Sequence, residues 1–263
     1  MERSKKKDIA FLILLLALLI ALNYSFLDRN LESFLNDYRE VYIDSVIDGD
    51  TIKSGEERIR LLGINSPERG EAFYEEAREF LEERVLNKTV TLTFGKDKTD
   101  RYGRTLAYVL SDGMNVNREI VENGFANYYF PSGKEFQYNS FVESWEACVE
   151  ENVNFCEVSL NACRQCIILE EFNHEDEVVV LRNSCSFECD LTGWEIKDEG
   201  RKKFVFPNKI LESGEKVEVI VAEQGDGSES VLVWERKDYV WTDSGDTLFL
   251  RDREGGLVLW KNY

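Results

Sequence analysis

The chain has 263 residues, of which 43% are hydrophobic, and its formal net charge is −19 at pH 7. This length and hydrophobic content allow two modest domains, each with its own core. Residues 38–150 carry 14 basic and 22 acidic side chains, and residues 167–263 carry 12 basic and 22 acidic side chains. This balance excludes the broad cationic surface of a tight, non-specific nucleic-acid binder. It does not exclude a local cationic site.

A cationic tail and a long apolar segment begin the chain. Residues 9–22 are an unbroken apolar run, and its extension to residue 27 gives a segment of about 28 Å as a helix, close to the thickness of a bilayer core. The KKK run at 5–7 favours a cytoplasmic tail over residues 1–8, with the rest of the chain outside. No small-x-small cleavage site follows the run, so we expect residues 9–27 to be an uncleaved transmembrane signal-anchor; a cleaved signal peptide and secretion are the alternative.

Residues 28–37 form a polar linker, and a strand-rich segment follows it. Five strands are predicted from short apolar runs between turn residues, at 38–47, 51–54, 58–64, 89–94 and 104–110. Apolar side chains at helical spacing predict a helix over 68–86, between the third and fourth strands. This order matches a five-stranded OB-type barrel with added helices.

Two further helices are expected after these strands. Asn115 or Asn117 can cap a short helix that ends at Asn123-Gly124. A last helix is predicted over 134–150, with Phe136 and Trp145 among its inward-facing side chains.

Six cysteines follow, at positions 148, 156, 163, 166, 185 and 189. An even number behind an export signal indicates disulfides. Cys185 and Cys189 can pair within one loop, and the four cysteines at 148–166 can form two disulfides or a Cys₄ zinc site. We expect disulfides, because zinc-binding thiols in an exported chain face oxidation.

After a cysteine-containing linker at 153–166, the pattern changes to short strands and turns. Runs such as EVVVLRN, KFVFP and DTLFLRD alternate with Gly and Asp, which predicts a small all-β sandwich over 167–263. The only histidine, His174, lies here without a partner for metal or acid–base chemistry, and we interpret it as a loop residue.

One stretch concentrates polar side chains that suit phosphate chemistry. Residues 47–68 read IDGDTIKSGEERIRLLGINSPE, in which a turn holds Asp48 and Asp50 between two strands. The folded strands would bring Asp50, Asn65 and Glu68 together with an arginine nearby. Oxygen ligands suit a hard cation such as Ca²⁺ or Mg²⁺, and a guanidinium suits a phosphate.

Three motifs in the first half of the chain resemble one known family, and five motifs in the second half resemble another. DGDT, IRLLGINSPE and TDRYGRTLAYV at 99–109 resemble the staphylococcal nuclease (thermonuclease) family in order and spacing, over 38–152. VVVLRN, LTGWEIKDEG, FVFP, LESGE and SGDTLFLRDREG resemble a lamin-tail domain, an immunoglobulin-like module, over 167–263. The first resemblance implies a calcium-dependent nuclease that acts on DNA, RNA or both and leaves 3′-phosphates. The second implies a binding or tethering accessory, and the sequence identifies no partner for it.

The first resemblance implies the roles of the catalytic residues. Glu68 is the candidate general base, and Arg60 and Arg104 are the candidate phosphate clamps. Each has an ordinary alternative: a helix-capping carboxylate for Glu68 and strand-end surface charges for the arginines. Tyr102 and Lys98 are candidate substrate contacts, or simple loop surface.

The same resemblance assigns the calcium ligands to Asp50, Asn65 and Ser66, the last through its backbone carbonyl. Asn65 stands where the family usually has a second aspartate. An amide oxygen still coordinates calcium, but the lost charge should weaken binding. Asp48 either supports the metal's waters or only shapes the turn.

Three functions compete. The first is a membrane-anchored or secreted calcium-dependent nuclease. The second is a non-catalytic nucleic-acid or protein binding module with a degenerate metal site, and the third is a structural surface protein that acts through its lamin-tail half. The joint presence of Asp50, Arg60, Glu68 and Arg104 favours the nuclease, because a binding module has no need of all four.

Overall fold

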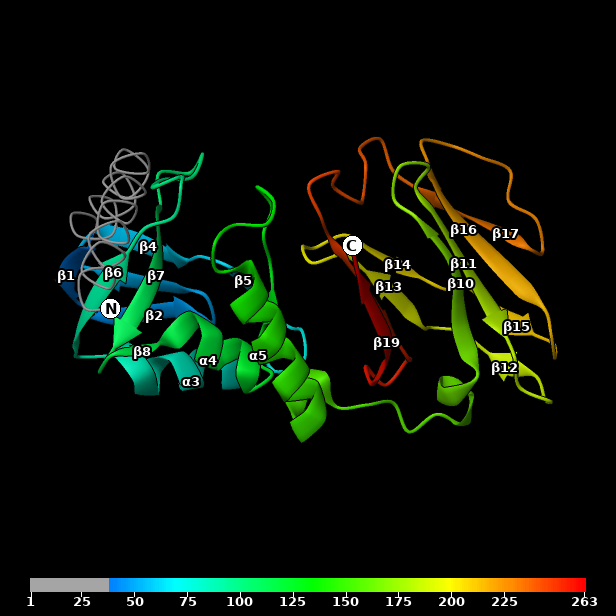
Figure 1. Cartoon of the computed structure of the whole chain (residues 1–263), viewed down its shortest axis with the longest axis horizontal. Coiled ribbons are helices and arrows are strands. Elements are labelled where there is room, and N and C mark those ends of the chain that lie inside the picture. Colours follow the sequence, from blue (N-terminus) through cyan, green and yellow to red (C-terminus); the bar gives the residue numbers. More distant parts are fainter. Residues whose placement is uncertain (1–37) are drawn as a thin grey trace, which may run out of the picture.

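The computed structural model describes residues 38–263. The predicted tail at 1–8, signal-anchor at 9–27 and linker at 28–37 lie outside the described residues and stay predictions. Within residues 38–263, no helix is both long and apolar enough to cross a membrane. Figure 1 shows two β-rich halves side by side, with β5 (Ile64–Asn65) and α5 (Tyr138–Glu151) of the first facing β13 (Glu195–Lys197), β14 (Lys203–Val205) and β19 (Leu257–Asn262) of the second.

The first half keeps the predicted succession of main strands and helices but adds the short strands β5, β8 and β9. The chain as a whole is mainly β with a few helices, as expected. The elements of the first half are β1 (Tyr38–Tyr42), β2 (Ser45–Asp48), β3 (Thr51–Ser54), β4 (Glu57–Leu61), β5 (Ile64–Asn65), α3 (Tyr74–Val85), β6 (Thr89–Thr93), β7 (Thr105–Ser111), β8 (Met114–Asn115), α4 (Val116–Glu122), β9 (Asn127–Tyr128) and α5 (Tyr138–Glu151). One sheet has the order β1-β6-β7-β4-β3-β2, with β8 paired to β7. The strand predicted over 38–47 is divided in two, because β1 pairs with β6 whereas β2 pairs with β3.

The helices differ from their predictions mainly at their starts. The helix predicted over 68–86 begins only at Tyr74, because the chain adopts positive φ at Gly70 and Phe73 (92° and 64°), which no helix tolerates. The start of α4 is as predicted, since the Asn115 side chain accepts a hydrogen bond from the Arg118 backbone N–H. The predicted inward position of Phe136 is wrong: it precedes α5 and is fully exposed.

The second half packs two four-stranded sheets, β10-β11-β16-β17 and β14-β13-β18-β19, and adds the short pair β12-β15. Its elements are the 3₁₀ turns η1 (Asn154–Cys156) and η2 (Ala162–Gln165), then β10 (Ile167–Asn173), β11 (Val178–Asn183), β12 (Cys189–Asp190), β13 (Glu195–Lys197), β14 (Lys203–Val205), β15 (Ile210–Leu211), β16 (Lys216–Ala222), β17 (Val231–Glu235), β18 (Thr247–Arg251) and β19 (Leu257–Asn262). Burial alternates along β11, as expected for a strand with one face on a core. Trp194 and Trp241 are among the buried side chains of this core.

The two halves share a buried contact. Phe249 of β18 belongs to the hydrophobic cluster of the first half, where its ring centroid lies 5.1 Å from that of Trp145 and 6.2 Å from that of Tyr128. The Tyr128 hydroxyl also lies 2.7 Å from the Thr247 hydroxyl, as a buried hydrogen bond. This apolar and polar contact fixes the position of the second half next to β5 and β9.

All six cysteines are paired, but not as the loop spacing suggested. The disulfides are Cys148–Cys156, Cys163–Cys189 and Cys166–Cys185. The predicted Cys185–Cys189 pair is therefore wrong. Of the first four cysteines, Cys148 and Cys156 pair with each other as the prediction allowed, whereas Cys163 and Cys166 pair with the later two. Cys163 lies in the 3₁₀ turn η2 and Cys166 directly follows it as the C-cap. Their partners are Cys189 at the start of β12 and Cys185 in the loop before β12. The sulfurs of Cys163, Cys185 and Cys189 lie within 4.8 Å of one another, but all three are used in disulfides.

We expect no free thiol in the isolated protein. Without reduction, alkylation should label none of the six cysteines, and after reduction it should label all six, since each sulfur has a partner. Peptide mapping by mass spectrometry should recover the three pairs given above. Six reactive thiols before reduction, or stoichiometric zinc, would contradict the pairing.

Candidate active site

The turn between β2 and β3 presents two carboxylates because a glycine separates them. Asp48 accepts a hydrogen bond from the Asp50 backbone N–H at 3.1 Å, which closes the turn. A Cβ at Gly49 would lie 2.7 Å from Cβ of Ala77 in α3 and 2.8 Å from Cβ of Ser66. A larger residue would therefore push α3 and Ser66 away and move Asp50 out of its site.

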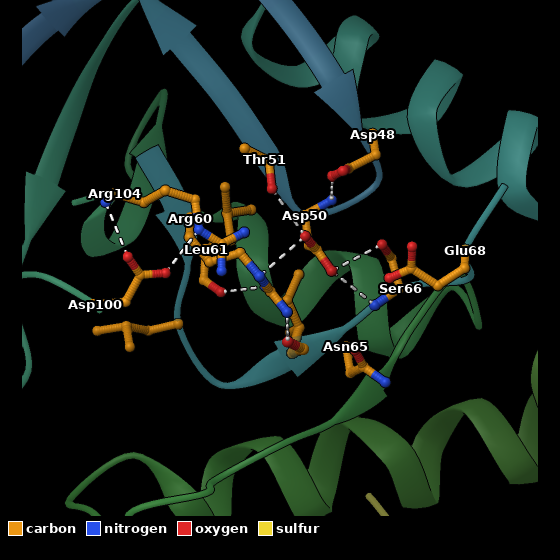
Figure 2. Close-up of polar contacts among 12 residues, drawn as sticks. Asp48, Asp50, Thr51, Arg60, Leu61, Asn65, Ser66, Glu68, Asp100 and Arg104 are labelled. Carbon is orange, nitrogen blue, oxygen red and sulfur yellow. Dashed lines mark hydrogen bonds and ion pairs between the residues drawn. The ribbon is translucent and has the colours of Figure 1, made fainter. Parts of the chain in front are cut away.

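Asp50 is buried, with only 3% of its surface exposed, and both of its oxygens accept hydrogen bonds (Figure 2). Oδ2 accepts from the Ser66 backbone N–H at 3.0 Å and from the Ser66 hydroxyl at 2.9 Å. Oδ1 accepts from the Thr51 hydroxyl and lies 3.0 Å from Nε of Arg60. Burial opposes ionisation, but Arg60 and the Ser66 and Thr51 hydrogen bonds hold the pKa of Asp50 below its usual value, so this carboxylate is an anion.

The donor atoms around Asp50 fit a hard cation. Burial, and then the charge of Asp50, raise the pKa of Asp48 to about 6, so two carboxylates are held close enough to repel. A cation relieves such repulsion, and the carboxylate oxygens of Asp48 and Asp50 are the kind that Ca²⁺ prefers. The residues present therefore fit calcium.

Arg60 is held at the bend between β4 and β5. The strand predicted over 58–64 breaks there, since Gly63 has a φ of 75°. The Arg60 guanidinium follows the bend and donates from Nη1 to the Leu61 carbonyl at 2.8 Å and from Nη2 to the Ile64 carbonyl at 2.9 Å. These bonds and the Asp50 pair occupy three of its five N–H groups, which leaves two for a phosphate.

Arg104 comes from the loop before β7 and is oriented by Asp100. Nε of Arg104 donates to Asp100 Oδ2 at 2.7 Å, and Asp100 also accepts from the backbone N–H groups of Tyr102 and Arg104. The Arg104 guanidinium lies 5.7 Å from the centroid of the Tyr102 ring, and Tyr102 is 68% exposed. Arg104 and Tyr102 line a cavity of about 670 Å³ together with Arg60. The structure thus brings the two predicted clamps and Tyr102 together.

The ammonium of Lys98 lies 5.5 Å from the Phe94 ring centroid, and its substrate contact stays a prediction.

Glu68 lies in the turn after Pro67, not in a helix. Because α3 starts six residues later, the alternative of a helix-capping carboxylate at this position is wrong. The Glu68 backbone N–H donates to Glu71 Oε2 at 2.8 Å, and its half-exposed carboxylate forms an ion pair with Arg201 of the second half. Glu68 lines a second cavity of about 570 Å³, together with Ser66.

Asn65 pairs with Asn127 across the short β5–β9 ladder, and both side chains reach the second half. Nδ2 of Asn65 donates to the Gly200 carbonyl at 2.8 Å, and Nδ2 of Asn127 donates to the Glu199 carbonyl at 2.7 Å. The Asn65 nitrogen is therefore used between the halves, and a metal can take only its amide oxygen. Its role as a ligand stays a prediction.

Residues of the second half that the sequence did not single out line the larger cavity. Asp198, Glu199 and Asp246 are buried there, from the loop after β13 and the start of β18. Burial, and then the charge of Asp246, raise the pKa of Asp198 to about 7 and that of Glu199 to about 8. These carboxyl groups therefore carry less negative charge near pH 7 than their number suggests, and repel a phosphate less.

Asn65→Asp tests the contact between the halves. The variant loses the donor to Gly200 and places a carboxylate against carbonyl oxygens, so we expect it to lower the free energy of unfolding by about 1–3 kcal/mol without calcium. Chemical denaturation in a chelator measures this, with the exposed Asn208→Asp as the control. Added calcium should recover part of the loss if the new carboxylate is a ligand. Unchanged stability would mean that the Asn65 amide does not hold the loop.

Comparison with known proteins gives two family matches. The model described as "Staphylococcal nuclease homologue" matches residues 58–154, and the "Lamin Tail Domain" model matches residues 163–263. The first range contains Arg60, Asn65, Glu68 and Arg104 and begins after the Asp50 turn.

Individual relatives give the same result for the first half. The chain is 32% identical over 155 residues to a "Thermonuclease" of Staphylococcus hyicus, an alignment that covers 52% of this chain and 90% of that protein. It is 35% identical over 104 residues to a "Thermonuclease" of Staphylococcus intermedius, an alignment that covers 35% of this chain and 62% of that protein. It is also 40% identical over 89 residues to an "Uncharacterized endonuclease" of Escherichia coli O157:H7, an alignment that covers 32% of this chain and 57% of that protein.

Proposed function

Because this chain belongs to the staphylococcal nuclease family and carries a lamin tail domain after its nuclease domain, we propose that it is a calcium-dependent nuclease whose Glu68 activates the attacking water. The observation that carries this proposal is the position of Glu68. Its half-exposed carboxylate lies in a turn two residues from Ser66, which is hydrogen-bonded to the buried Asp50. A general base and a cation site are thus adjacent.

Each residue has a role that follows from its surroundings. The Glu68 carboxylate takes a proton from water, and the resulting hydroxide attacks phosphorus in the phosphodiester bond. The bond from phosphorus to the 5′-oxygen breaks, and this leaving oxygen takes a proton from solvent, so that the products are a 3′-phosphate and a 5′-hydroxyl. The free N–H groups of Arg60 and the guanidinium of Arg104 donate to the phosphoryl oxygens as negative charge develops there. Asp100 and Asp50 hold the two arginines in place through the ion pairs described above.

The calcium ligands in this proposal are Asp50, the amide oxygen of Asn65 and the backbone carbonyl of Ser66. When bound, the cation supplies positive charge next to the phosphoryl group. The all-oxygen donor set supports calcium, while the missing second aspartate makes us expect weaker binding than a site with two carboxylate ligands would give.

We also propose that both domains act outside the membrane, either anchored by residues 9–27 or released by cleavage after them. The apolar run behind a cationic tail supports this, and so do the three disulfides, which form in oxidising compartments.

A cleavage assay tests the proposed activity. The full chain should be incubated with end-labelled DNA and RNA oligonucleotides, single- and double-stranded, in calcium or in a chelator. We expect cleavage in calcium, its loss in the chelator and its return on adding calcium back, with 3′-phosphate product ends. No cleavage of any substrate in calcium would overturn the proposed nuclease function, and full activity in the chelator would overturn the metal requirement.

A further inference from the structure

The loop between β13 and β14 of the lamin tail domain is fixed against the active site. Its Glu199 carbonyl accepts from Asn127 and its Gly200 carbonyl accepts from Asn65, as described above. The Glu199 side chain also accepts from the Phe130 backbone N–H at 3.0 Å and from the Thr247 hydroxyl at 2.8 Å. These contacts are buried, so the residue that follows Gly200 has a defined position.

That residue is Arg201, and it lies between the two parts of the active site. Its guanidinium forms an ion pair with Glu68, with the two side chains 63% and 50% exposed. Among the described residues, only Arg201 and Asn65 line both cavities. The larger cavity contains Arg60 and Arg104, and the smaller cavity contains Ser66 and Glu68. Arg201 therefore borders both the cavity of the two clamps and the cavity of the proposed base.

An exposed ion pair of this kind is weak, because water screens both charges. A phosphodiester can compete for the guanidinium, which binds two phosphate oxygens at once in a planar fork. Arginines supplied by a second domain or protein are known to stabilise the charge that develops in phosphoryl transfer.

We propose that Arg201 of the lamin tail domain leaves Glu68 when substrate binds and contacts the phosphoryl group alongside Arg60 and Arg104. The active site is then shared between two domains, and the lamin tail domain takes part in catalysis. The proposal rests on the nuclease function proposed above. A guanidinium from this domain also supplies positive charge locally in a nuclease half whose overall charge is negative.

The test compares Arg201→Gln with Arg253→Gln in the full chain. Arg253 is a matched control, because it lies in the same domain, is 65% exposed and pairs only with the adjacent Glu254 among the residues described. We expect Arg201→Gln to lower kcat/KM by about 10- to 100-fold, the range for a lost hydrogen bond to a charged group, and Arg253→Gln to leave it unchanged. Thermal unfolding should be the same in both variants, and Arg201→Lys should recover part of the activity.

Other outcomes have distinct meanings. Equal activity in wild type and Arg201→Gln would overturn the proposal, and faster cleavage would show instead that Arg201 holds Glu68 inactive. If the wild type cleaves nothing, the nuclease function fails, but binding still tests Arg201. Fluorescence anisotropy with a cleavage-resistant phosphorothioate-linked oligonucleotide should then show weaker binding by Arg201→Gln than by Arg253→Gln, and equal binding would overturn the contact.

Discussion

Glu68→Gln should lower the turnover number by at least about 10²-fold, the scale of losing a general base. Glutamine keeps the size of the side chain and can still accept a hydrogen bond, but it cannot take a proton from water. Because Glu68 is half exposed and lies in a turn outside α3, the substitution should leave the fold intact. Steady-state cleavage kinetics in saturating calcium measure the effect, with thermal unfolding as the check on the fold.

Glu76→Gln is the matched control for this variant. Glu76 is an exposed glutamate in the first turn of α3, close in sequence to Glu68 and outside both cavities. Its loss removes the same charge from the same region, so any general electrostatic effect on substrate binding appears in both variants. Equal turnover in Glu68→Gln and Glu76→Gln would remove Glu68 from the mechanism.

Asp50→Asn should abolish calcium-dependent cleavage and also destabilise the nuclease domain. Both Asp50 oxygens accept hydrogen bonds, whereas asparagine has one acceptor, so its amide nitrogen would face a donor of either Ser66 or Arg60. Arg60 would also lose its counter-charge while only 7% exposed. Removal of one partner from a buried ion pair costs about 3–5 kcal/mol, which is the loss in the free energy of unfolding that we expect here.

The cleavage assay and calorimetric titration with calcium check the first part of this prediction, and denaturation in urea checks the second. Asp112→Asn is the control, because Asp112 lies on the surface with positive φ, a conformation that asparagine also adopts readily. Unchanged calcium affinity in Asp50→Asn would show that Asp50 is not a ligand. Unchanged stability would show that the Arg60 pair contributes nothing to the fold.

Local patterns in the sequence determined most of the secondary structure and most of the candidate site residues of this protein. Alternating and helical spacing located the strands and the buried faces of the helices, because these periods reflect backbone geometry within a few residues. The DGDT turn, Arg60, Glu68 and the loop with Tyr102 and Arg104 were also identified, since each motif is contiguous. The structure brings Arg60, Tyr102 and Arg104 to one cavity and Ser66 and Glu68 to its neighbour.

Features that depend on distant parts of the chain were decided only by the tertiary structure. Cys185 and Cys189 pair with Cys166 and Cys163, not with each other, because the fold and not the loop spacing places their sulfurs. The Asn65 side chain bonds to Gly200, 135 residues away, and the same contact sets Arg201 beside Glu68. No periodicity or motif in the sequence encodes such a contact. It exists because burial of Phe249 between Tyr128 and Trp145 brings the two domains together.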